Sequence, residues 1–246
     1  MKQLYLDIES SPLSGFTWGL WNQNIGLNQI IKPTQMLSFA AKFRDEKRTR
    51  FHSVFHDGQA EMVQAAHDYL DSCDVLFSWN GKRFDVPHLH REFVEQGFTP
   101  PSAYKHVDLM VTAKSQFKLP SNKLQYVSTW LGLDGKVSHS GFELWVKCMQ
   151  GDTKAWALMR KYNKQDVVLL EQIHDRLLPW VKGLPNAGLY GDVDTVCRAC
   201  ASEKLEKRGF AYTDQSKFQQ YRCNDCGAWT RSTRREAGVQ LTKVAQ

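Results

Sequence analysis

Three short segments of the sequence place acidic side chains beside apolar ones. In the first, Asp7 and Glu9 alternate with aliphatic residues, so the segment is predicted to be a strand with both carboxylates on one face. In the second, Asp85 follows an apolar run and a loop that contains glycine. In the third, Asp166 shares one stripe of a predicted helix with Tyr162 and several aliphatic residues. Unpaired carboxylates are costly to bury, so each acid needs a compensating partner.

Each segment also has an ordinary structural interpretation. Asp7 and Glu9 could lie on an exposed strand face or form salt bridges with Lys and Arg. Asp85 stands two residues before Pro87, and Pro is common in the first turn of a helix, so Asp85 could be an N-cap. Tyr162 could be an ordinary aromatic residue of the core.

Taken together, the four carboxylates suggest one site. If the fold brought them close, they would repel one another and raise their pKa values unless cations neutralised them. Carboxylate oxygens suit Mg²⁺ or Mn²⁺. Two such ions roughly 4 Å apart can stabilise the attacking and the leaving oxygen in phosphodiester hydrolysis. The pattern therefore indicates metal-dependent cleavage of phosphodiester bonds.

The three segments also resemble a known family. They look like the three motifs, in the same order, of the DEDD or DnaQ-like 3′-to-5′ exonucleases, which have an RNase H-like fold. The motifs are Asp7-x-Glu9, Asn80-x-x-x-Phe84-Asp85 and Tyr162-x-x-x-Asp166. The last one is similar to the tyrosine subclass, since Lys161 stands where the histidine subclass has His. The sequence around Trp18 and around Asn80 is most similar to that of the predicted exonucleases of phage and bacterial genomes that carry a C-terminal zinc ribbon.

The resemblance, which covers about residues 1–180, implies a role for each residue of the three motifs. Asp7 would contact both catalytic metal ions, and Glu9 and Asp166 would complete the site of the ion that holds the attacking water. Asp85 would serve the second ion. Tyr162 would orient the water.

Further residues are candidates for contacts with nucleic acid. They are Asn80, Lys82, Arg83 and Lys123 in the first part of the chain, and Trp229 and Arg231 near its end. The cations among them could equally be solvated surface charges. Trp18, Trp21 and Trp79 could stack on bases or pack in the core. The long segment between Glu9 and Met36, rich in Trp, Asn and Gln, would either guide a single strand or block internal substrate.

Four cysteines near the end of the chain form two pairs. Cys197-x-x-Cys200 and Cys223-x-x-Cys226 are separated by 22 residues, which a hairpin can bridge. Four thiolates leave no open position on a tetrahedral Zn²⁺, so we expect one structural zinc; a redox pair is the alternative. Aromatic and basic side chains surround the pairs, so a zinc ribbon that binds nucleic acid is predicted, with protein docking as the other possibility.

Composition and charge support a division of the chain. Of the net charge of +6, residues 1–196 contribute +1 and residues 197–246 contribute +5. A stretch rich in glycine precedes the cysteines, so we expect a nuclease domain over 1–181, a linker over 182–195 and a ribbon domain over 196–246.

Targeting signals and membrane segments are not expected. The first residues carry two carboxylates where a secretory signal would need an apolar core, and no apolar run approaches about 18 residues. A cytoplasmic protein is predicted, in the host cytoplasm if a phage encodes it, without a membrane partner.

The predicted architecture is α/β. Strands are expected over residues 3–9, 36–43, 51–55 and 75–77, with a helix over 59–70 and a mostly helical remainder up to residue 180. This order favours an RNase H-like mixed sheet flanked by helices, followed by a small zinc ribbon.

These inferences predict a metal-dependent 3′-to-5′ exonuclease that acts on DNA, at single-stranded 3′ ends. A structure-specific endonuclease or an RNase of the same fold is one alternative. A non-catalytic module that binds nucleic acid or a polymerase is another, although a binder would not need four clustered acids. DNA is the expected partner, together with a DNA polymerase or another replication protein.

Overall fold

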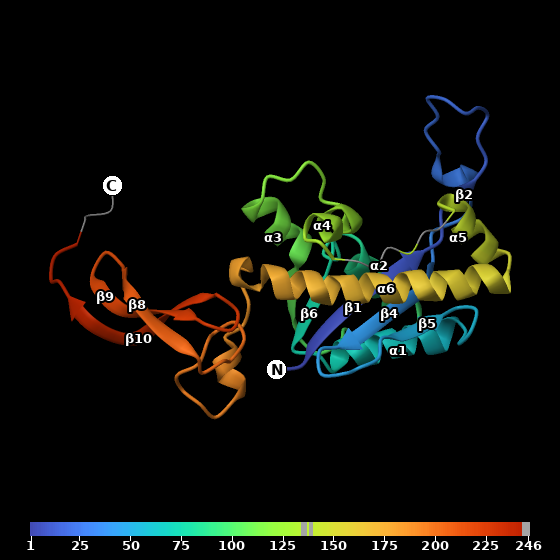
Figure 1. Ribbon diagram of the computed structural model, residues 1–246. Helices are drawn as coiled ribbons and strands as arrows, with labels where there is room; N and C mark the ends of the chain where they lie inside the picture. Colours follow the sequence, from blue (N-terminus) through green and yellow to red (C-terminus); the bar gives the residue numbers. More distant parts are fainter. Residues whose placement is uncertain (134–136, 138–139, 243–246) are drawn as a thin grey trace. The chain divides into compact units, whose positions relative to one another are not determined.

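The computed structural model describes residues 1–133, 137 and 140–242 (Figure 1). The chain divides into two compact units. The larger spans Lys2–Ile173, and the smaller holds His174–Gln246 together with Met1. The domain boundaries proposed from the sequence, near residues 181 and 196, stay predictions.

The larger unit contains a mixed sheet and the helices that cover it. Its strands are β1 (Gln3–Ser10), β2 (Ser14–Gly15), β3 (Ile30–Lys32), β4 (Met36–Phe43), β5 (Arg50–Ser53), β6 (Val75–Ser78) and β7 (Lys105–Asp108). Its helices are α1 (Gln59–Asp71), α2 (Asp85–Glu95), α3 (Leu109–Gln116), α4 (Leu124–Trp130), α5 (Phe142–Met149) and α6 (Thr153–Leu177), whose last residues belong to the smaller unit.

The main sheet has the strand order β5-β4-β1-β6-β7. β1 is antiparallel to β4 and parallel to β6, β6 is parallel to β7, and β4 is antiparallel to β5. β1 therefore lies in the middle of a mixed sheet. The predicted α/β class with a mixed sheet flanked by helices is confirmed.

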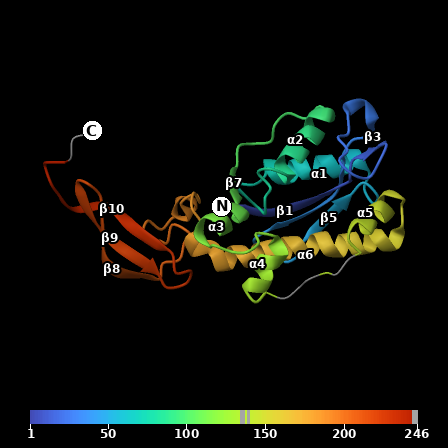
Figure 2. The same ribbon diagram turned by 90° about the horizontal axis from the view of Figure 1, so that it is seen from above.

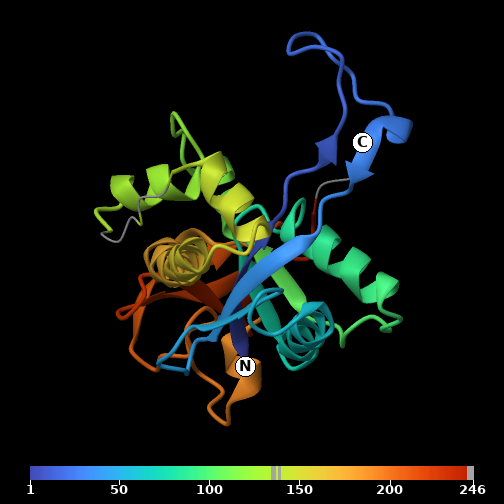
Figure 3. The same ribbon diagram turned by 90° about the vertical axis from the view of Figure 1, so that its right-hand side faces the viewer.

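Helices cover both faces of this sheet (Figures 2 and 3). α1 and α2 pack on one face, where the aliphatic side chains of β1 meet the apolar sides of both helices. α5 and α6 cover the other face, and their buried residues include Leu144 and Trp156. Because side chains alternate along a strand, Asp7 and Glu9 point away from the aliphatic cluster and toward α6.

The sequence analysis missed β7. Only Val107 in this strand is a buried apolar residue, so the segment has no apolar alternation that would reveal it. The strand forms because its backbone pairs in parallel with β6, and Asp108 at its end caps α3 by accepting the N–H of Met110 at 3.1 Å.

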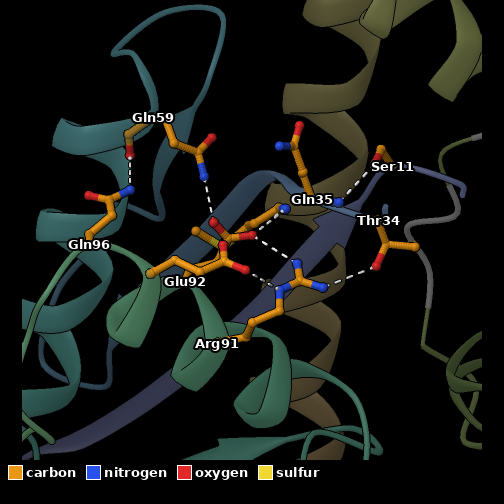
Figure 4. Close-up of polar contacts among 9 residues, drawn as sticks. Ser11, Thr34, Gln35, Gln59, Arg91, Glu92 and Gln96 are labelled. Carbon is orange, nitrogen blue, oxygen red and sulfur yellow. Dashed lines mark hydrogen bonds and ion pairs between the residues drawn. The ribbon is translucent and has the colours of Figure 1, made fainter. Parts of the chain in front are cut away.

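A buried glutamate ties three elements of the unit together (Figure 4). Glu92 of α2 is only 2% exposed. Its carboxylate accepts the N–H of Met36 at the start of β4 at 2.9 Å and the amide of Gln59 at the start of α1 at 2.6 Å. Arg91 donates to the same carboxylate at 3.0 Å. These bonds compensate the burial of the charge and fix where β4 begins.

The smaller unit holds an antiparallel sheet of β8 (Leu205–Tyr212), β9 (Ser216–Cys223) and β10 (Trp229–Gly238), with β9 in the middle. Short 3-10 turns occur at Leu27–Gln29 in the larger unit and at Leu178–Trp180 and Ala187–Tyr190 in this one. The buried apolar cluster of the sheet contains Cys197, Cys223 and Ala228. A core this small needs a further source of stability.

No helix within the described ranges combines the length and the apolar character that crossing a bilayer requires.

Replacing Glu92 by Ala is expected to lower the free energy of unfolding by about 2–4 kcal/mol, because it leaves the buried N–H of Met36, the half-buried amide of Gln59 and the Arg91 guanidinium without the carboxylate that accepts their hydrogen bonds. Urea unfolding followed by circular dichroism measures the loss. The matched control is Glu95→Ala, since Glu95 is exposed and pairs with the same arginine; it should change stability by less than about 0.5 kcal/mol. Equal losses in both variants would contradict this role of Glu92.

Candidate active site and metal centres

Three of the predicted acids lie together in the larger unit. One carboxylate oxygen from each of Asp7, Glu9 and Asp166 lies within 4.8 Å of the other two. The two-residue spacing on β1 puts the first two acids on one face, and the apolar stripe of α6 turns Asp166 toward that face. The predicted grouping of these three residues is therefore present in the fold.

Asp85 joins the group from another direction. It is the first residue of α2, is 3% exposed, and accepts the backbone N–H of Ile8 at 3.0 Å. β6 pairs with β1 only as far as Tyr5, so Asp85 takes up a donor of β1 that lies beyond this pairing. The N-cap of α2 is Phe84, and the N-cap interpretation of Asp85 is wrong because its carboxylate reaches across to β1.

The loop before α2 is packed tightly against Asp85. A Cβ atom on Gly81 would lie 2.4 Å from the hydroxyl oxygen of Ser78 and 3.1 Å from a carboxylate oxygen of Asp85, so only glycine fits there. Asn80 has the left-handed φ of 66°, and its N–H donates to Asp108 at 3.0 Å. The loop therefore holds Asp85 in one position.

Asn163 is a site residue that the sequence analysis missed. It is fully buried, and its side-chain amide donates to the Asp7 carboxylate at 2.7 Å and to the Asp7 carbonyl oxygen at 3.1 Å. Its own carbonyl oxygen accepts from the Ser38 hydroxyl at 3.3 Å. The signal that could have revealed it is a polar residue next to Tyr162 in a helix that packs on the sheet.

Trp145 of α5 is a second residue that was missed. Its indole N–H donates to the Glu9 carboxylate at 3.1 Å, and its ring meets that of Tyr162 edge to face with centroids 6.1 Å apart. The Tyr162 hydroxyl in turn donates to Asp166. Nothing in the sequence relates Trp145 to Glu9, because only the packing of α5 brings them together.

Burial and mutual repulsion make these carboxylates hard to ionise. Burial raises the pKa of Asp7 well above its ordinary value, and the three other charges raise it further. Burial and then the charge of Asp166 raise the pKa of Glu9 to about 8, although the bond from Trp145 opposes the shift. Burial raises the pKa of Asp85 to about 7 and that of Asp166 to about 6. No Lys or Arg among the described residues forms an ion pair with any of the four.

The donor set fits a divalent cation. Carboxylate oxygens within a few ångströms of one another are the ligands that Mg²⁺ and Mn²⁺ prefer, and a cation would relieve the repulsion that raises the pKa values. The neighbours Asn163, Trp145 and Tyr162 donate hydrogen bonds without supplying positive charge. The cluster can therefore hold a metal ion through Asp7, Glu9 and Asp166, with Asp85 beside it.

The predicted phosphate contacts of this unit lie in two places. Lys82 and Arg83 are exposed in the loop that follows Asn80, directly before Asp85. Lys123 is exposed at the N-cap of α4, where it lines a groove with Tyr126 and Trp130. Their contacts with nucleic acid stay predictions.

The four cysteines of the smaller unit cluster as predicted, with sulfur atoms within 4.8 Å of one another. The shortest distances join different pairs: Cys197 to Cys226 at 3.6 Å and Cys200 to Cys223 at 3.7 Å. A tetrahedral zinc with Zn–S bonds of about 2.3 Å separates its sulfurs by about 3.8 Å. A disulfide would need about 2.05 Å. The arrangement therefore fits a structural zinc better than a redox pair.

Aromatic and basic side chains gather on the sheet of the smaller unit. The Arg231 guanidinium lies 3.9 Å above the centre of the Phe218 ring. Both residues line a groove of about 640 Å³ together with Arg198 and Trp229, whose side chain is 51% exposed. The groove offers cations and an exposed ring, as the predicted contacts of Trp229 and Arg231 with nucleic acid would require.

Comparison with known proteins identifies the superfamily of the larger unit. A family model of the RNase H superfamily matches residues 4–178. The fold is also similar to that of the family B DNA polymerase from the hyperthermophilic archaeon Pyrobaculum calidifontis, with a TM-score of 0.56 and 17% sequence identity. The match covers 72% of this chain, which spans only 24% of the polymerase chain. None of the curated proteins matches the sequence.

The raised pKa values predict that stability without added metal falls as the pH rises. The folded protein holds protons on these carboxyls where the unfolded chain has released them. A rise in pH between about 4.5 and 8, the ordinary and the raised pKa of Glu9, therefore lowers the free energy of unfolding. A fixed Mg²⁺ concentration, a hundredfold above the Kd at pH 8, should add about 2.7 kcal/mol at that pH, roughly 5–10 °C in Tm, and less at pH 5, where protons compete for the carboxylates. Thermal melting measures both effects. A Tm gain that is the same at both pH values, or that persists in Asp7→Asn, would contradict metal binding by these acids.

One zinc ion per chain is expected in native mass spectra. Replacing both Cys223 and Cys226 by Ser should abolish it and unfold the sheet of the smaller unit, because little else stabilises it. The matched control is Cys148→Ala, which alters a buried cysteine of the larger unit and should keep the zinc. Retention of zinc by the double variant would refute the four-cysteine site.

Proposed function

Because the chain belongs to the RNase H superfamily, we propose that it is a metal-dependent nuclease that removes nucleotides from single-stranded 3′ ends of DNA. The observation that carries the proposal is the buried or half-buried cluster of Asp7, Glu9, Asp85 and Asp166, which has hydrogen-bond donors around it but no ion pair with a Lys or Arg in the part of the chain that the structure describes. A cluster of this kind destabilises the fold unless it binds a cation. A module that only bound nucleic acid would have no use for it.

The chemistry of the site depends on two divalent ions, Mg²⁺ or Mn²⁺. Asp7, Glu9 and Asp166 would hold one of them, and Asp7 with Asp85 the other. When bound, such ions neutralise the phosphate charge and make water a better nucleophile. The protein positions the ligands: Asn163 fixes the Asp7 carboxylate, and Trp145 fixes that of Glu9.

Tyr162 acts as a hydrogen-bond donor in this proposal. Burial and the nearby carboxylates raise the pKa of its hydroxyl well above the ordinary value of 10.0, so it keeps its proton at neutral pH. It cannot serve as the base that activates water. It donates to Asp166 and, with substrate present, is placed to orient the attacking water.

The choice of DNA and of the 3′ end has separate support. The likeness to a DNA polymerase favours DNA over RNA. The order Asp7-x-Glu9, Asp85 and Tyr162-x-x-x-Asp166 resembles that of 3′-to-5′ exonucleases. The smaller unit, with one zinc ion, would bind the nucleic acid through Trp229 and Arg231. A polymerase or another replication protein is a further proposed partner.

Single-stranded DNA labelled at its 5′ end tests the reaction. In Mg²⁺ or Mn²⁺ the labelled strand should shorten one nucleotide at a time, and EDTA should stop it. Internal cuts would make the protein an endonuclease, faster cleavage of matched RNA would make it an RNase, and no cleavage with either ion would leave a binding module.

Variants of the site should lose activity to different extents. Asp7→Asn removes a shared ligand and should lower kcat by about a thousandfold or more, whereas Asn163→Ala and Tyr162→Phe disturb positions only and should cost about ten- to a hundredfold. Single-turnover rates measure these effects. The control is Asp68→Asn, an exposed acid of α1 whose carboxylate bonds Gln64, and its rate should match the wild type. Full activity in Asp7→Asn would refute the assignment.

A further inference from the structure

Residues 12–34 form a long connection between β1 and β4, which are neighbouring strands of the main sheet. We call this connection the arm. It leaves the sheet after β1, pairs β2 with β3 near its root, and returns at the start of β4. Figures 1 and 3 show the arm standing away from the sheet and from the helices of its unit. Its role is not explained by the cleavage site itself.

The arm exposes large apolar side chains to an unusual degree. Trp18 is 97% exposed and Trp21 is 83% exposed. The other large apolar side chains that are at least 60% exposed are Phe16, Leu20, Leu27 and Ile31. Monomeric proteins rarely leave so much apolar surface in one place unless something binds there.

The arm carries a single charged residue, Lys32 at the end of β3. Between Ser10 and Ile31 the sequence contains no Asp, Glu, Lys or Arg. The exposed polar side chains between Phe16 and Ile30 are four amides, Asn22, Gln23, Asn24 and Asn28, and the hydroxyl of Thr17. Amides can pair with the edges of bases and aromatic rings can stack on their faces, while the absence of acids avoids repulsion of phosphates.

The arm keeps its shape without using these apolar side chains. Gln29 closes it from within: its backbone carbonyl accepts the N–H of Phe16 at 2.9 Å, its amide donates back to the Phe16 carbonyl at 3.2 Å, and its side-chain oxygen accepts the N–H of Gly26 at 2.7 Å. These bonds fix both ends of the segment that carries Trp18 and Trp21, and within it the Gln23 side chain donates to the Trp21 carbonyl at 2.8 Å. Fixing the ends of the segment lowers the entropy cost of binding.

The root of the arm is fixed to the helix that carries Asp85 (Figure 4). Ser11 and Gln35 exchange hydrogen bonds of 2.8 and 2.9 Å across the root. Arg91 of α2 donates to the Thr34 hydroxyl at 3.2 Å and also bonds Glu92. Since Ser11 is only two residues beyond Glu9, the root is held next to the carboxylate cluster.

We propose that the arm is a stacking surface for unpaired bases of the strand whose end is being cleaved. The inference rests on the proposed function and adds the path of the substrate to it. The adjacency to Glu9 favours this occupant, because a protein partner or a second copy bound to the arm would compete with the substrate for space. Stacking on Trp18 and Trp21 would tolerate any base sequence, since every base has a flat face.

The arm should matter for long substrates and not for short ones. Loss of one stacked base weakens affinity by about five- to 150-fold. The double variant Trp18→Ala/Trp21→Ala, in an Asp7→Asn background that does not cleave, should therefore bind a fluorescent single strand of about 12 nucleotides at least tenfold more weakly. The matched control is Trp180→Ala, a tryptophan of the 3-10 turn Leu178–Trp180 that is 48% exposed. It should leave the affinity unchanged.

The kinetic readout is the ratio of kcat/KM on the 12-nucleotide strand to kcat/KM on a dinucleotide. This ratio should fall at least tenfold in the double variant with active Asp7, mainly through KM, and stay constant in Trp180→Ala. An unchanged ratio together with unchanged affinity would overturn the arm proposal while the proposed function stands. Failure of the wild type to cleave either substrate would instead refute the proposed function, and the binding measurement would still test the arm. Self-association that the double variant loses without any loss of DNA affinity would assign the arm to a second copy and overturn the proposal.

Discussion

Repulsion among four carboxylates that are buried or half-buried shapes how the larger unit is built. Asp7 and Glu9 come from the central strand, Asp166 from α6, and Asp85 from α2, so three elements must hold like charges together. The neighbours that hold them are neutral donors, which orient the carboxylates without neutralising them. In the proposed site a divalent cation from solution relieves the repulsion, so the arrangement that raises the pKa values without metal also favours metal binding.

Sequence periodicity could predict the site residues whose side-chain direction is set by their own strand or helix. Alternation along β1 predicted that Asp7 and Glu9 share a face, and the helical stripe of α6 predicted that Asp166 faces the sheet. Asn163 and Trp145 could not be recognised as site residues from the sequence, because their roles depend on contacts with residues more than 100 positions away. The link from Asp85 to Ile8 depends on where β6 stops pairing, which is a property of the sheet and not of either segment.

Two peripheral features use different means to stay ordered outside the main core. The arm relies on backbone and amide hydrogen bonds centred on Gln29 and on a root tied to α2. The sheet of the smaller unit relies on four sulfur atoms whose spacing suits zinc. Both present aromatic side chains to solvent, which suits the proposed single-stranded substrate because bases can stack on such rings.

If the carboxylate cluster binds divalent metal ions, anomalous diffraction from crystals soaked in Mn²⁺ will reveal them. We expect two peaks about 4 Å apart, one of them within coordination distance of Asp7, Glu9 and Asp166 and the other between Asp7 and Asp85. An absence of Mn²⁺ at these carboxylates in fully soaked crystals at pH 8 would contradict metal binding by the cluster.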